Sequence, residues 1–344
     1  MRRFRTARGA LGYARGALSL LQPPPPEGEL ALPSQEGRRI ALGHRFRMLC
    51  WNIQYCGGRG RRFFYDGGAD VRVDRVEVEE ALAGVGALIR AWSPDLVLLQ
   101  EVDRSADRTV RIDQHEALAR AVGLPLALSA PYHRVNWVPF PFDAQLGRVD
   151  MHLSVLSAFQ ATRAARWNLP LLRETWLRRR FNLRRILLEV DLATESGAPL
   201  RVFNTHLSAF SYGDGSLGQQ IARCVSAGDA AERNQGRWAM AGDFNTLPPG
   251  DRPSRLGADA ALYPEAESPI RALTDRFATA ETPETLGDHR WRSWIPWGSN
   301  QPDRQLDWMF RGSGIQVLEH RVDPAGGRWS DHLPLITDLL VTPG

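Results

Sequence analysis

Six short polar motifs interrupt this 344-residue chain, each at the point where an apolar run ends. In chain order they are Trp51-Asn52-Ile53, Leu99-Gln100-Glu101-Val102, Asn204-Thr205-His206-Leu207, Gly242-Asp243-Phe244-Asn245, Leu306-Asp307-Trp308 and Ser330-Asp331-His332. Apolar runs that end in polar residues are typical of α/β sheets, which place their active sites at strand ends. The set therefore predicts a sheet that gathers residues from distant parts of the chain around one site.

Strands and helices alternate between these motifs. Helical spacing of apolar residues predicts a helix over 74–92, and Asp113 with Glu116 forms a capping box that opens a second helix closing at Gly123. A third helix is expected over 216–233. The predicted strands span 45–51, 96–99, 149–156, 186–192, 200–204, 238–241, 306–310 and 333–341. The Pro- and Trp-rich segment 250–298 is expected to be mostly loop.

The composition is ordinary for a soluble globular protein. An apolar fraction of 43% argues against wholesale disorder. No apolar run approaches the ~20 residues that cross a bilayer. Three scattered cysteines are too few for a disulfide framework and fit a reducing compartment, so we expect a cytoplasmic location. The formal net charge of +4 permits an anionic partner without specifying one.

Residues 1–44 differ from the rest and are interpreted as a basic tail and a Pro-rich linker before one domain over 45–344. The first 22 residues contain five arginines and no acid, and prolines fill 23–26. Gly12, Arg15 and Gly16 interrupt the apolar run that a secretory signal requires. Two alternatives stay open for the tail: a solvated extension, or a peripheral contact with an anionic membrane.

The motif side chains are those that metal-dependent phosphate-ester chemistry requires. Oxygen ligands dominate, which favours Mg²⁺ or Mn²⁺ over zinc, and Glu101 with Asn52 matches the few carboxylates that Mg²⁺ uses. Asp307 and His332 suggest a general base whose tautomer is fixed by a carboxylate.

The remaining motif residues have roles around the phosphate. Asp243 can orient or deprotonate the attacking water or reach a second metal, and Asn245 can donate to a phosphoryl oxygen. His206 is placed to bind the phosphate or to protonate the leaving oxygen.

Over about residues 46 to 342 the chain resembles the endonuclease/exonuclease/phosphatase superfamily, which has the DNase I-like fold. Gly242-Asp243-Phe244-Asn245 and Ser330-Asp331-His332 carry the resemblance most strongly. It implies an α/β fold, a four-layer sandwich of two packed mixed β-sheets flanked by helices. It also implies that Asn52 and Glu101 hold the metal and that Asp331 supports the metal or the phosphate. The implied catalytic set is His206, Asp243, Asn245, Asp307 and His332.

Two departures from the motifs of the superfamily narrow the choice among its branches. Gln54 stands where abasic-site nucleases of this superfamily usually have an Asp, and His206 instead resembles the DNase I, sphingomyelinase, inositol phosphatase and deadenylase branches. The superfamily's middle-strand motif is matched only loosely, by residues 152–157.

We therefore expect a monomeric Mg²⁺- or Mn²⁺-dependent phosphoesterase that cleaves a phosphodiester or phosphomonoester by in-line attack of activated water. Nucleic acid, phospholipid and small phosphate esters remain open as substrates. The alternative is a non-catalytic phosphate- or nucleic-acid-binding relative with the same fold.

Other polar and aromatic groups carry weaker signals. His152 is interpreted as a core or edge histidine. The other histidines outside the motifs are interpreted as surface residues: His44, His115, His133, His289 and His320. Three clusters could touch substrate or serve only structure: Arg59, Arg61 and Arg62 beside Phe63, Phe64 and Tyr65; Arg178, Arg179 and Arg180 with Arg184 and Arg185; and Trp291, Trp294 and Trp297.

Overall fold

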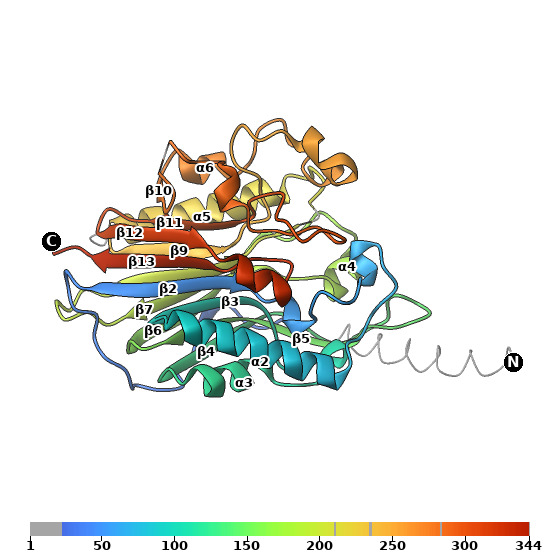
Figure 1. Cartoon of the computed structure of the whole chain (residues 1–344), viewed down its shortest axis with the longest axis horizontal. Coiled ribbons are helices and arrows are strands. Elements are labelled where there is room, and N and C mark those ends of the chain that lie inside the picture. Colours follow the sequence, from blue (N-terminus) through green and yellow to red (C-terminus); the bar gives the residue numbers. More distant parts are fainter. Residues whose placement is uncertain (1–22, 210, 234–235, 283, 344) are drawn as a thin grey trace, which may run out of the picture.

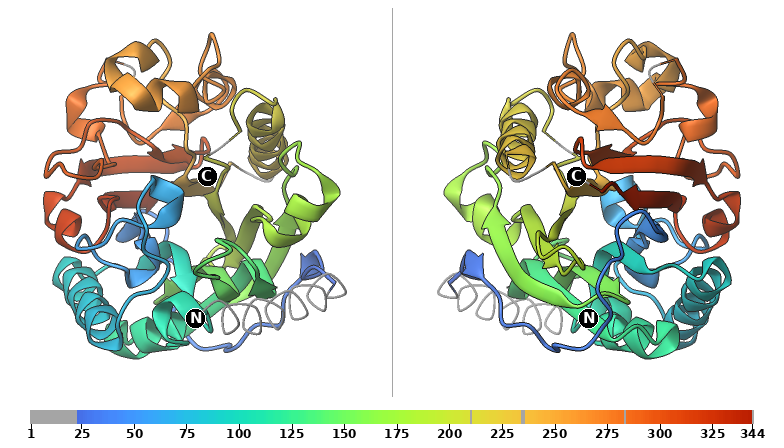
Figure 2. Two further views of the ribbon diagram at one scale, coloured as in Figure 1. Left: turned by 90° about the vertical axis from the view of Figure 1, so that its right-hand side faces the viewer. Right: turned by 90° about the vertical axis from the view of Figure 1, so that its left-hand side faces the viewer.

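Two β-sheets pack face to face, and helices cover both outer faces (Figures 1 and 2). The computed structural model describes residues 23–209, 211–233, 236–282 and 284–343. Within them, one sheet has the strand order β1 (Gly28–Glu29), β6 (Ala161–Asn168), β7 (Ile186–Leu192), β8 (Leu200–His206), β9 (Trp238–Asp243), β11 (Asp307–Arg311) and β10 (Ala278–Thr279). The other has the order β12 (Ile315–Val322), β13 (Leu335–Val341), β2 (Arg45–Asn52), β3 (Leu96–Asp103), β5 (Gly147–Ser157) and β4 (Leu126–Val138). Each contains one parallel pair, β8 with β9 and β2 with β3, so both sheets are mixed.

The helices complete the outer layers. Helices α2 (Arg75–Trp92) and α3 (Gln114–Val122) lie on the second sheet, and α5 (Ser216–Glu232) lies on the first. Helices α4 (Trp176–Phe181) and α6 (Arg271–Thr274) are short. The 3-10 helices are η1 (Gln54–Cys56), η2 (Phe64–Asp66), η3 (Asp107–Thr109), η4 (Pro253–Leu262), η5 (His289–Trp291) and η6 (Pro324–Arg328). No helix in the described ranges is both long and apolar enough to cross a membrane.

Three apolar clusters hold these four layers together. The largest lies between the sheets and includes Leu98 and Val155 from one and Val190 and Val202 from the other. A second packs the buried face of α2 against its sheet, and a third packs α5 against the opposite sheet. Because both faces of each sheet are buried, the central strands are almost continuously apolar. The expected DNase I-like four-layer sandwich is confirmed.

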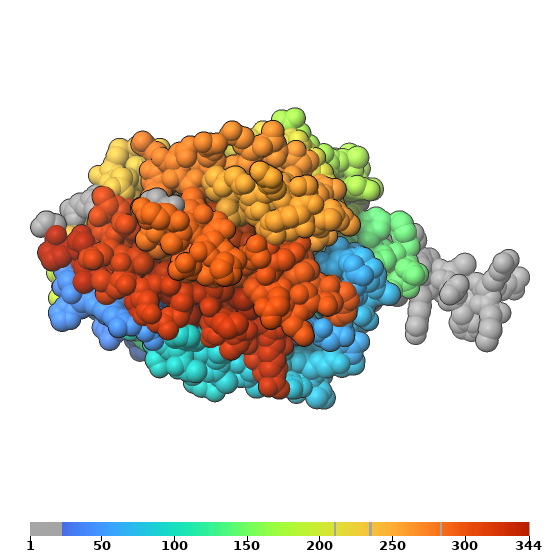
Figure 3. All heavy atoms as spheres, turned by 45° about the horizontal axis from the view of Figure 1, so that its top comes forward, coloured from blue at the N-terminus to red at the C-terminus, as the bar shows by residue number. Residues whose placement is uncertain are grey.

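The helices predicted from sequence are present where they were expected. Helix α2 begins one residue after Asp74, and Asp113 caps α3 by accepting a hydrogen bond from the Glu116 backbone N–H. Gly123 ends α3 in the left-handed conformation. The segment 250–298 contains only short elements and spreads over the upper surface of the molecule in Figure 3.

Five strands had no predicted counterpart: β1 and β10, which are two residues long, and the longer β4, β6 and β12. Strand β4 contains Pro131 and several polar residues, and β6 contains two arginines, so neither presents an apolar run. Strand β12 lies at a sheet edge, and all its residues but Ile315 are exposed or half-buried. A strand of this kind carries little of the hydrophobic signal on which a sequence-based prediction depends.

The interpretation of three histidines as surface residues was wrong. His115, His133 and His320 are buried, whereas His44 and His289 are exposed. Each buried ring has an internal partner: Ser154 Oγ at 2.6 Å, the Phe181 carbonyl at 2.8 Å and Thr337 Oγ1 at 2.8 Å, respectively. A satisfied hydrogen bond allows a polar ring to occupy an otherwise apolar layer.

The segment predicted as a linker packs on the domain. Gly28 and Glu29 pair with β6, and Ile40 is fully buried with its N–H bound to the Ala193 carbonyl. The proposed tail, residues 1–22, lies outside the described residues. The domain boundary at residue 45 therefore stays a prediction.

A buried amide pair joins the two sheets beside the polar strand ends. Gln100 Nε2 on β3 donates to Asn204 Oδ1 on β8 over 2.7 Å. Asn204 Nδ2 in turn donates to two carbonyls of the other sheet, those of Leu99 on β3 and Ser154 on β5, at 3.1 and 3.0 Å. Both side chains are completely buried.

Replacing Asn204 with Ala should leave these buried polar groups without the hydrogen bonds that Asn204 makes. The expected cost is about 2 to 4 kcal/mol in the free energy of unfolding, because Gln100 and the carbonyls of Leu99 and Ser154 each lose a hydrogen-bond partner in the core. Urea unfolding measures it, with Gln316→Ala on the exposed face of β12 as the matched control. A loss no larger than that of the control would show that the amide pair does not hold the sheets together.

Candidate active site

Three neighbouring strands align three of the predicted catalytic residues. His206 at the end of β8 is opposite Asp243 at the end of β9, and Asp243 is opposite Asp307 at the start of β11. Strand β11 runs antiparallel to β9, so its first residue lies at the same end of the sheet as the last residues of the other two. All three side chains are buried. The strand register alone therefore brings together residues about a hundred positions apart in the sequence.

The second sheet supplies Asn52 and Glu101 from the parallel pair β2 and β3. Asn52 Nδ2 lies 3.4 Å from Glu101 Oε1 and 3.1 Å from Asp243 Oδ2, so it bridges the two sheets. Glu101 has a φ of 56°, in the left-handed region, where β3 is bulged against β5. A bulge of this kind re-aims a side chain away from its regular position in the strand.

The last motif is tied to the first. Trp51 Nε1 donates to the His332 carbonyl at 2.8 Å, and Ser330 Oγ donates to the Asn52 carbonyl at 2.7 Å. The backbone N–H of Asp331 donates to Gln54 Oε1 at 3.2 Å. These contacts between segments about 280 residues apart hold His332 over the strand ends.

Asp307 and His332 form the expected pair. His332 Nδ1 lies 2.8 Å from Asp307 Oδ2, and the same oxygen accepts a 2.6 Å hydrogen bond from Ser293 Oγ. Burial lowers the pKa of His332, but the carboxylates of Asp307 and Asp243 outweigh it and hold that pKa well above its usual range. The pair is thus built to accept a proton at His332 Nε2 and to stabilise the resulting imidazolium.

Asp243 contacts more of the site residues than any other side chain described above. Its Oδ2 lies 3.2 Å from His206 Nε2 and 3.5 Å from His332 Nε2, and its Oδ1 accepts from the backbone N–H of Asn245 at 3.0 Å. Burial raises the pKa of Asp243 to about 6, with His332 opposing the shift and Asp307 adding to it. Asn245 has a left-handed backbone, φ 51°, and its amide donates to the Leu207 carbonyl at 3.0 Å.

The acidic residues have the character of a divalent-cation site. Burial and, after it, the nearby Asp331 carboxylate raise the pKa of Glu101 to about 7. Such a shift marks carboxylates that lack a countercharge, which a cation bound between them would supply. A second group that could hold a metal ion consists of Asp243, Asp307 and His332, whose potential ligand atoms lie within 4.8 Å of one another. The donor set of Asn52, Glu101 and Asp331 fits Mg²⁺ or Mn²⁺, and the identity of the ligands stays a prediction.

Two site residues were not recognised in the sequence, Tyr132 and Arg185. Tyr132 on β4 places its hydroxyl 3.3 Å from His206 Nδ1. Arg185, next to β7, is buried with its guanidinium carbon 5.7 Å from the Tyr132 ring, and its Nη1 has no hydrogen-bond partner among the described residues. Burial and the charge of Arg185 both hold the pKa of His206 well below its usual range.

Neither residue has a clear sequence signal. Tyr132 stands between Pro131 and His133, and Arg185 belongs to the arginine cluster that could touch substrate or serve only structure. Arg185 is nevertheless buried. Its burial beside the anionic cluster is a property of the folded sheets only.

Several other sequence signals have structural explanations. Arg61 pairs with Glu77 and Asp74, and Trp294 packs under the guanidinium of the buried Arg304 at 4.2 Å. His152 is buried in β5, as expected, with Nε2 3.0 Å from Asp150 Oδ1. These groups need no ligand to account for their positions.

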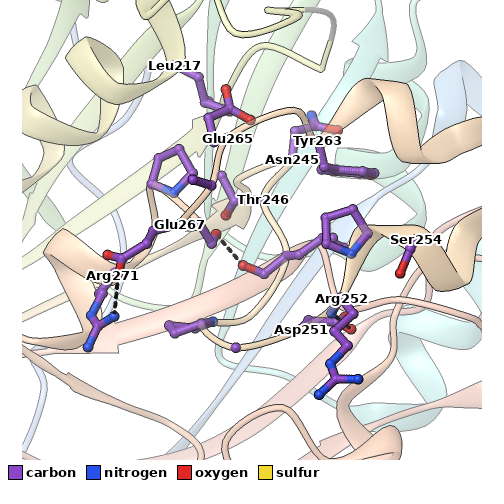
Figure 4. Close-up of a pocket in the computed structure, with 17 residues that line it drawn as sticks. Leu217, Asn245, Thr246, Asp251, Arg252, Ser254, Tyr263, Glu265, Glu267 and Arg271 are labelled. Carbon is purple, nitrogen blue, oxygen red and sulfur yellow. Dashed lines mark hydrogen bonds and ion pairs between the residues drawn. The ribbon is translucent and has the colours of Figure 1, made fainter.

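A pocket of about 500 Å³ adjoins Asn245. Figure 4 shows its walls, which come from the segment after the Gly-Asp-Phe-Asn motif together with Leu217 of α5. The lining mixes the Tyr263 ring with charged groups, and Glu267 and Arg271 form an ion pair at 3.2 Å. The pocket is therefore a polar recess next to a predicted phosphate-binding side chain.

Comparison with known proteins agrees with this geometry. The model of the endonuclease/exonuclease/phosphatase family matches residues 49–332. The chain belongs to this family, whose members are hydrolases of phosphate esters and are generally dependent on divalent metals. No curated protein sequence matches significantly.

Solved structures show the same fold. An endonuclease/exonuclease/phosphatase from Beutenbergia cavernae is 22% identical with a TM-score of 0.61, over 87% of this chain and 72% of that one. The human Nocturnin catalytic domain with a bound sulfate is 18% identical with a TM-score of 0.54, over 87% and 95%. ANGEL2, described as a 2′,3′-cyclic phosphatase in complex with adenosine-2′,3′-vanadate, is 13% identical with a TM-score of 0.54, over 93% and 100%.

The two adjacent arginines just before β7, Arg184 and Arg185, offer a test of this geometry. Arg185→Met should weaken the binding of inorganic phosphate at least about 10-fold, because a charge-assisted hydrogen bond is lost. Arg184→Met, which alters the half-buried neighbour, should leave the affinity unchanged. Isothermal titration calorimetry measures both, and equal affinities for the two variants would place Arg185 outside the anion site.

Proposed function

We propose that this protein is a Mg²⁺- or Mn²⁺-dependent phosphoesterase that hydrolyses a phosphodiester or phosphomonoester by in-line attack of an activated water. The observation that carries the proposal is the position of His332 Nε2. It lies 3.5 Å from Asp243 Oδ2, while Asp307 holds the other ring nitrogen at 2.8 Å. A base oriented in this way, beside a carboxylate that faces the metal ligands, is suited to activate water next to phosphorus.

Each chain group has a role in this reaction. His332 accepts the proton of the attacking water at Nε2, and Asp307 stabilises the imidazolium. Asp243 orients the water. We assign His206, Asn245 and Arg185 to the phosphoryl oxygens. Because burial and Arg185 hold the pKa of His206 well below its usual range, His206 is neutral and donates a hydrogen bond there, and the leaving oxygen takes its proton from solvent. A divalent cation held by Asn52, Glu101 and Asp331 would supply charge stabilisation to the phosphoryl group.

The substrate is a phosphate ester whose organic part fits beside Asn245. The pocket there has polar and aromatic walls, as an alcohol-bearing leaving group would need. ANGEL2, with its adenosine-2′,3′-vanadate, favours a nucleic-acid or nucleotide ester, and the fold alone permits phospholipid and other small esters equally.

A binding protein without catalysis is the competing function. Degenerate relatives are expected to lose a ligand or the base, but here Glu101, Asp243, Asn245, Asp307 and His332 are all present. The side chains of Glu101 and Asp243 contact Asn52, and the side chain of His332 contacts both Asp243 and Asp307. Maintaining several buried acids without catalysis would be costly for stability. The geometry therefore favours the enzyme.

Removing the base should abolish turnover without unfolding the chain. His332→Ala is expected to lower kcat at least ~10²-fold, because the proton acceptor is lost. His289→Ala, at an exposed histidine on η5, is the control and should retain full activity. The assay is hydrolysis of bis-p-nitrophenyl phosphate with Mn²⁺. A near-wild-type rate for His332→Ala would remove this residue from the mechanism.

Removing the charge of Glu101 should act on the metal. Glu101→Gln is expected to weaken Mn²⁺ binding at least about 10-fold, since a carboxylate ligand becomes a neutral amide. Calorimetric titration of the metal into chelator-treated protein gives the affinity independently of activity. Glu195→Gln, at an exposed acid, serves as control. If both variants bind Mn²⁺ like the wild type, Glu101 is not a ligand.

A further inference from the structure

Three large apolar side chains are exposed together at the end of the molecule that carries the site. Phe142 is 63% exposed, Trp176 70% and Leu177 42%. Phe142 lies in the loop between β4 and β5, and the other two begin α4. Phe140 joins the segments, with ring centroids 4.7 Å from Phe142 and 6.2 Å from Phe181 at the end of α4. We name Phe142, Trp176 and Leu177 the apolar tip.

Arginines surround the apolar tip. Arg173, Arg178 and Arg179 are exposed, and Arg180 and Arg184 are half-buried. Burial lowers the pKa of Arg184, and the charge of Arg180 lowers it further, which shows that positive charge is concentrated here. The acids on these two segments are Asp143 and Glu174, and Glu174 already accepts a hydrogen bond from Asn182. The surface is therefore strongly basic as well as apolar.

The tip lies at the same end of the sandwich as the candidate site. The Arg184 N–H donates to the carbonyl of Tyr132, whose hydroxyl contacts His206, and Arg185 follows directly in the chain. In Figure 1, α4 is on the right, at the end toward which β2 delivers Asn52. A surface that docks through this tip would thus bring its phosphate groups close to the strand ends.

The chain also joins the domain at this end. Arg166 Nη1 donates to the carbonyls of Pro25 and Pro26, and its Nε donates to the carbonyl of Pro131, next to Tyr132. Residues 1–22, which precede this point, contain five arginines and no acid. The basic N-terminal sequence and the basic tip therefore begin from neighbouring points of the domain.

We propose that the apolar tip and its arginines dock this protein onto an anionic membrane surface. Exposed Trp, Phe and Leu side chains gain free energy by entering the interface between headgroups and acyl chains. Each nearby arginine adds electrostatic attraction to anionic lipids. A nucleic acid would also attract the arginines, but Leu177 offers no ring for base stacking, so this combination fits lipid better.

The test is flotation of the full chain with phosphatidylcholine vesicles, with and without phosphatidylglycerol. Wild-type protein should bind the anionic vesicles and dissociate as salt is raised. The variant Phe142→Ser/Trp176→Ser/Leu177→Ser should bind them at least about 10-fold more weakly, because it loses the inserted apolar surface. Control variants Val76→Ser on α2 and Leu318→Ser on β12 remove exposed apolar groups elsewhere and should bind like the wild type.

Three outcomes would overturn the proposal. The first is a wild-type chain that binds no anionic vesicles. The second is a triple variant that binds them as tightly as the wild type, as expected if residues 1–22 act alone. The third is a triple variant that loses affinity for a single-stranded oligonucleotide but not for vesicles, which would assign the tip to nucleic acid. Unchanged thermal unfolding of the variants and unchanged hydrolysis of a soluble ester show that the fold and the site are intact.

Discussion

The buried amide pair of Gln100 and Asn204 is the interaction on which the rest of the site depends. Two sheets that pack through apolar side chains alone can slide, because dispersion and burial have no direction. Hydrogen bonds between fully buried amides do have a direction, and here they link β3 directly to β8. Gln100 precedes Glu101, and Asn204 lies two residues before His206. The pair therefore sets the distance between the predicted metal side of the site and its phosphate side.

The second constraint is electrostatic. The site buries several carboxylates around Asp243, and burial raises the pKa of both Asp243 and Glu101. Buried charges of this kind are retained only where other charges compensate them. His332 compensates part of the charge and Arg185 lies close by. A bound cation would compensate the carboxylates of Glu101 and Asp331. The stability of the apoprotein and the affinity for metal are thus two consequences of one arrangement.

Sequence predicted the parts of this structure that follow from apolar runs. All eight motif side chains proposed for the site come from strand ends or from the final loop. The contacts given above link six of them directly, Asn52, Glu101, His206, Asp243, Asp307 and His332. Tyr132 and Arg185 were missed because Tyr132 stands between Pro131 and His133, and Arg185 belongs to an arginine cluster that precedes the predicted strand 186–192. Their place in the site arises from sheet pairing, which a local pattern does not contain. The edge strand β12 was missed for the related reason that exposed residues carry no burial signal.

One measurement tests the central claim, that these residues form a single metal-dependent phosphoesterase site. It is hydrolysis of a panel of phosphate esters with Mg²⁺ and with Mn²⁺: plasmid DNA, single-stranded RNA, sphingomyelin, phosphoinositides and bis-p-nitrophenyl phosphate. The account predicts turnover of at least one member that disappears with a chelator and in Asp243→Ala. Turnover that survives both treatments would contradict it. So would a complete absence of turnover in protein that binds the metal, which would leave the site a binding role.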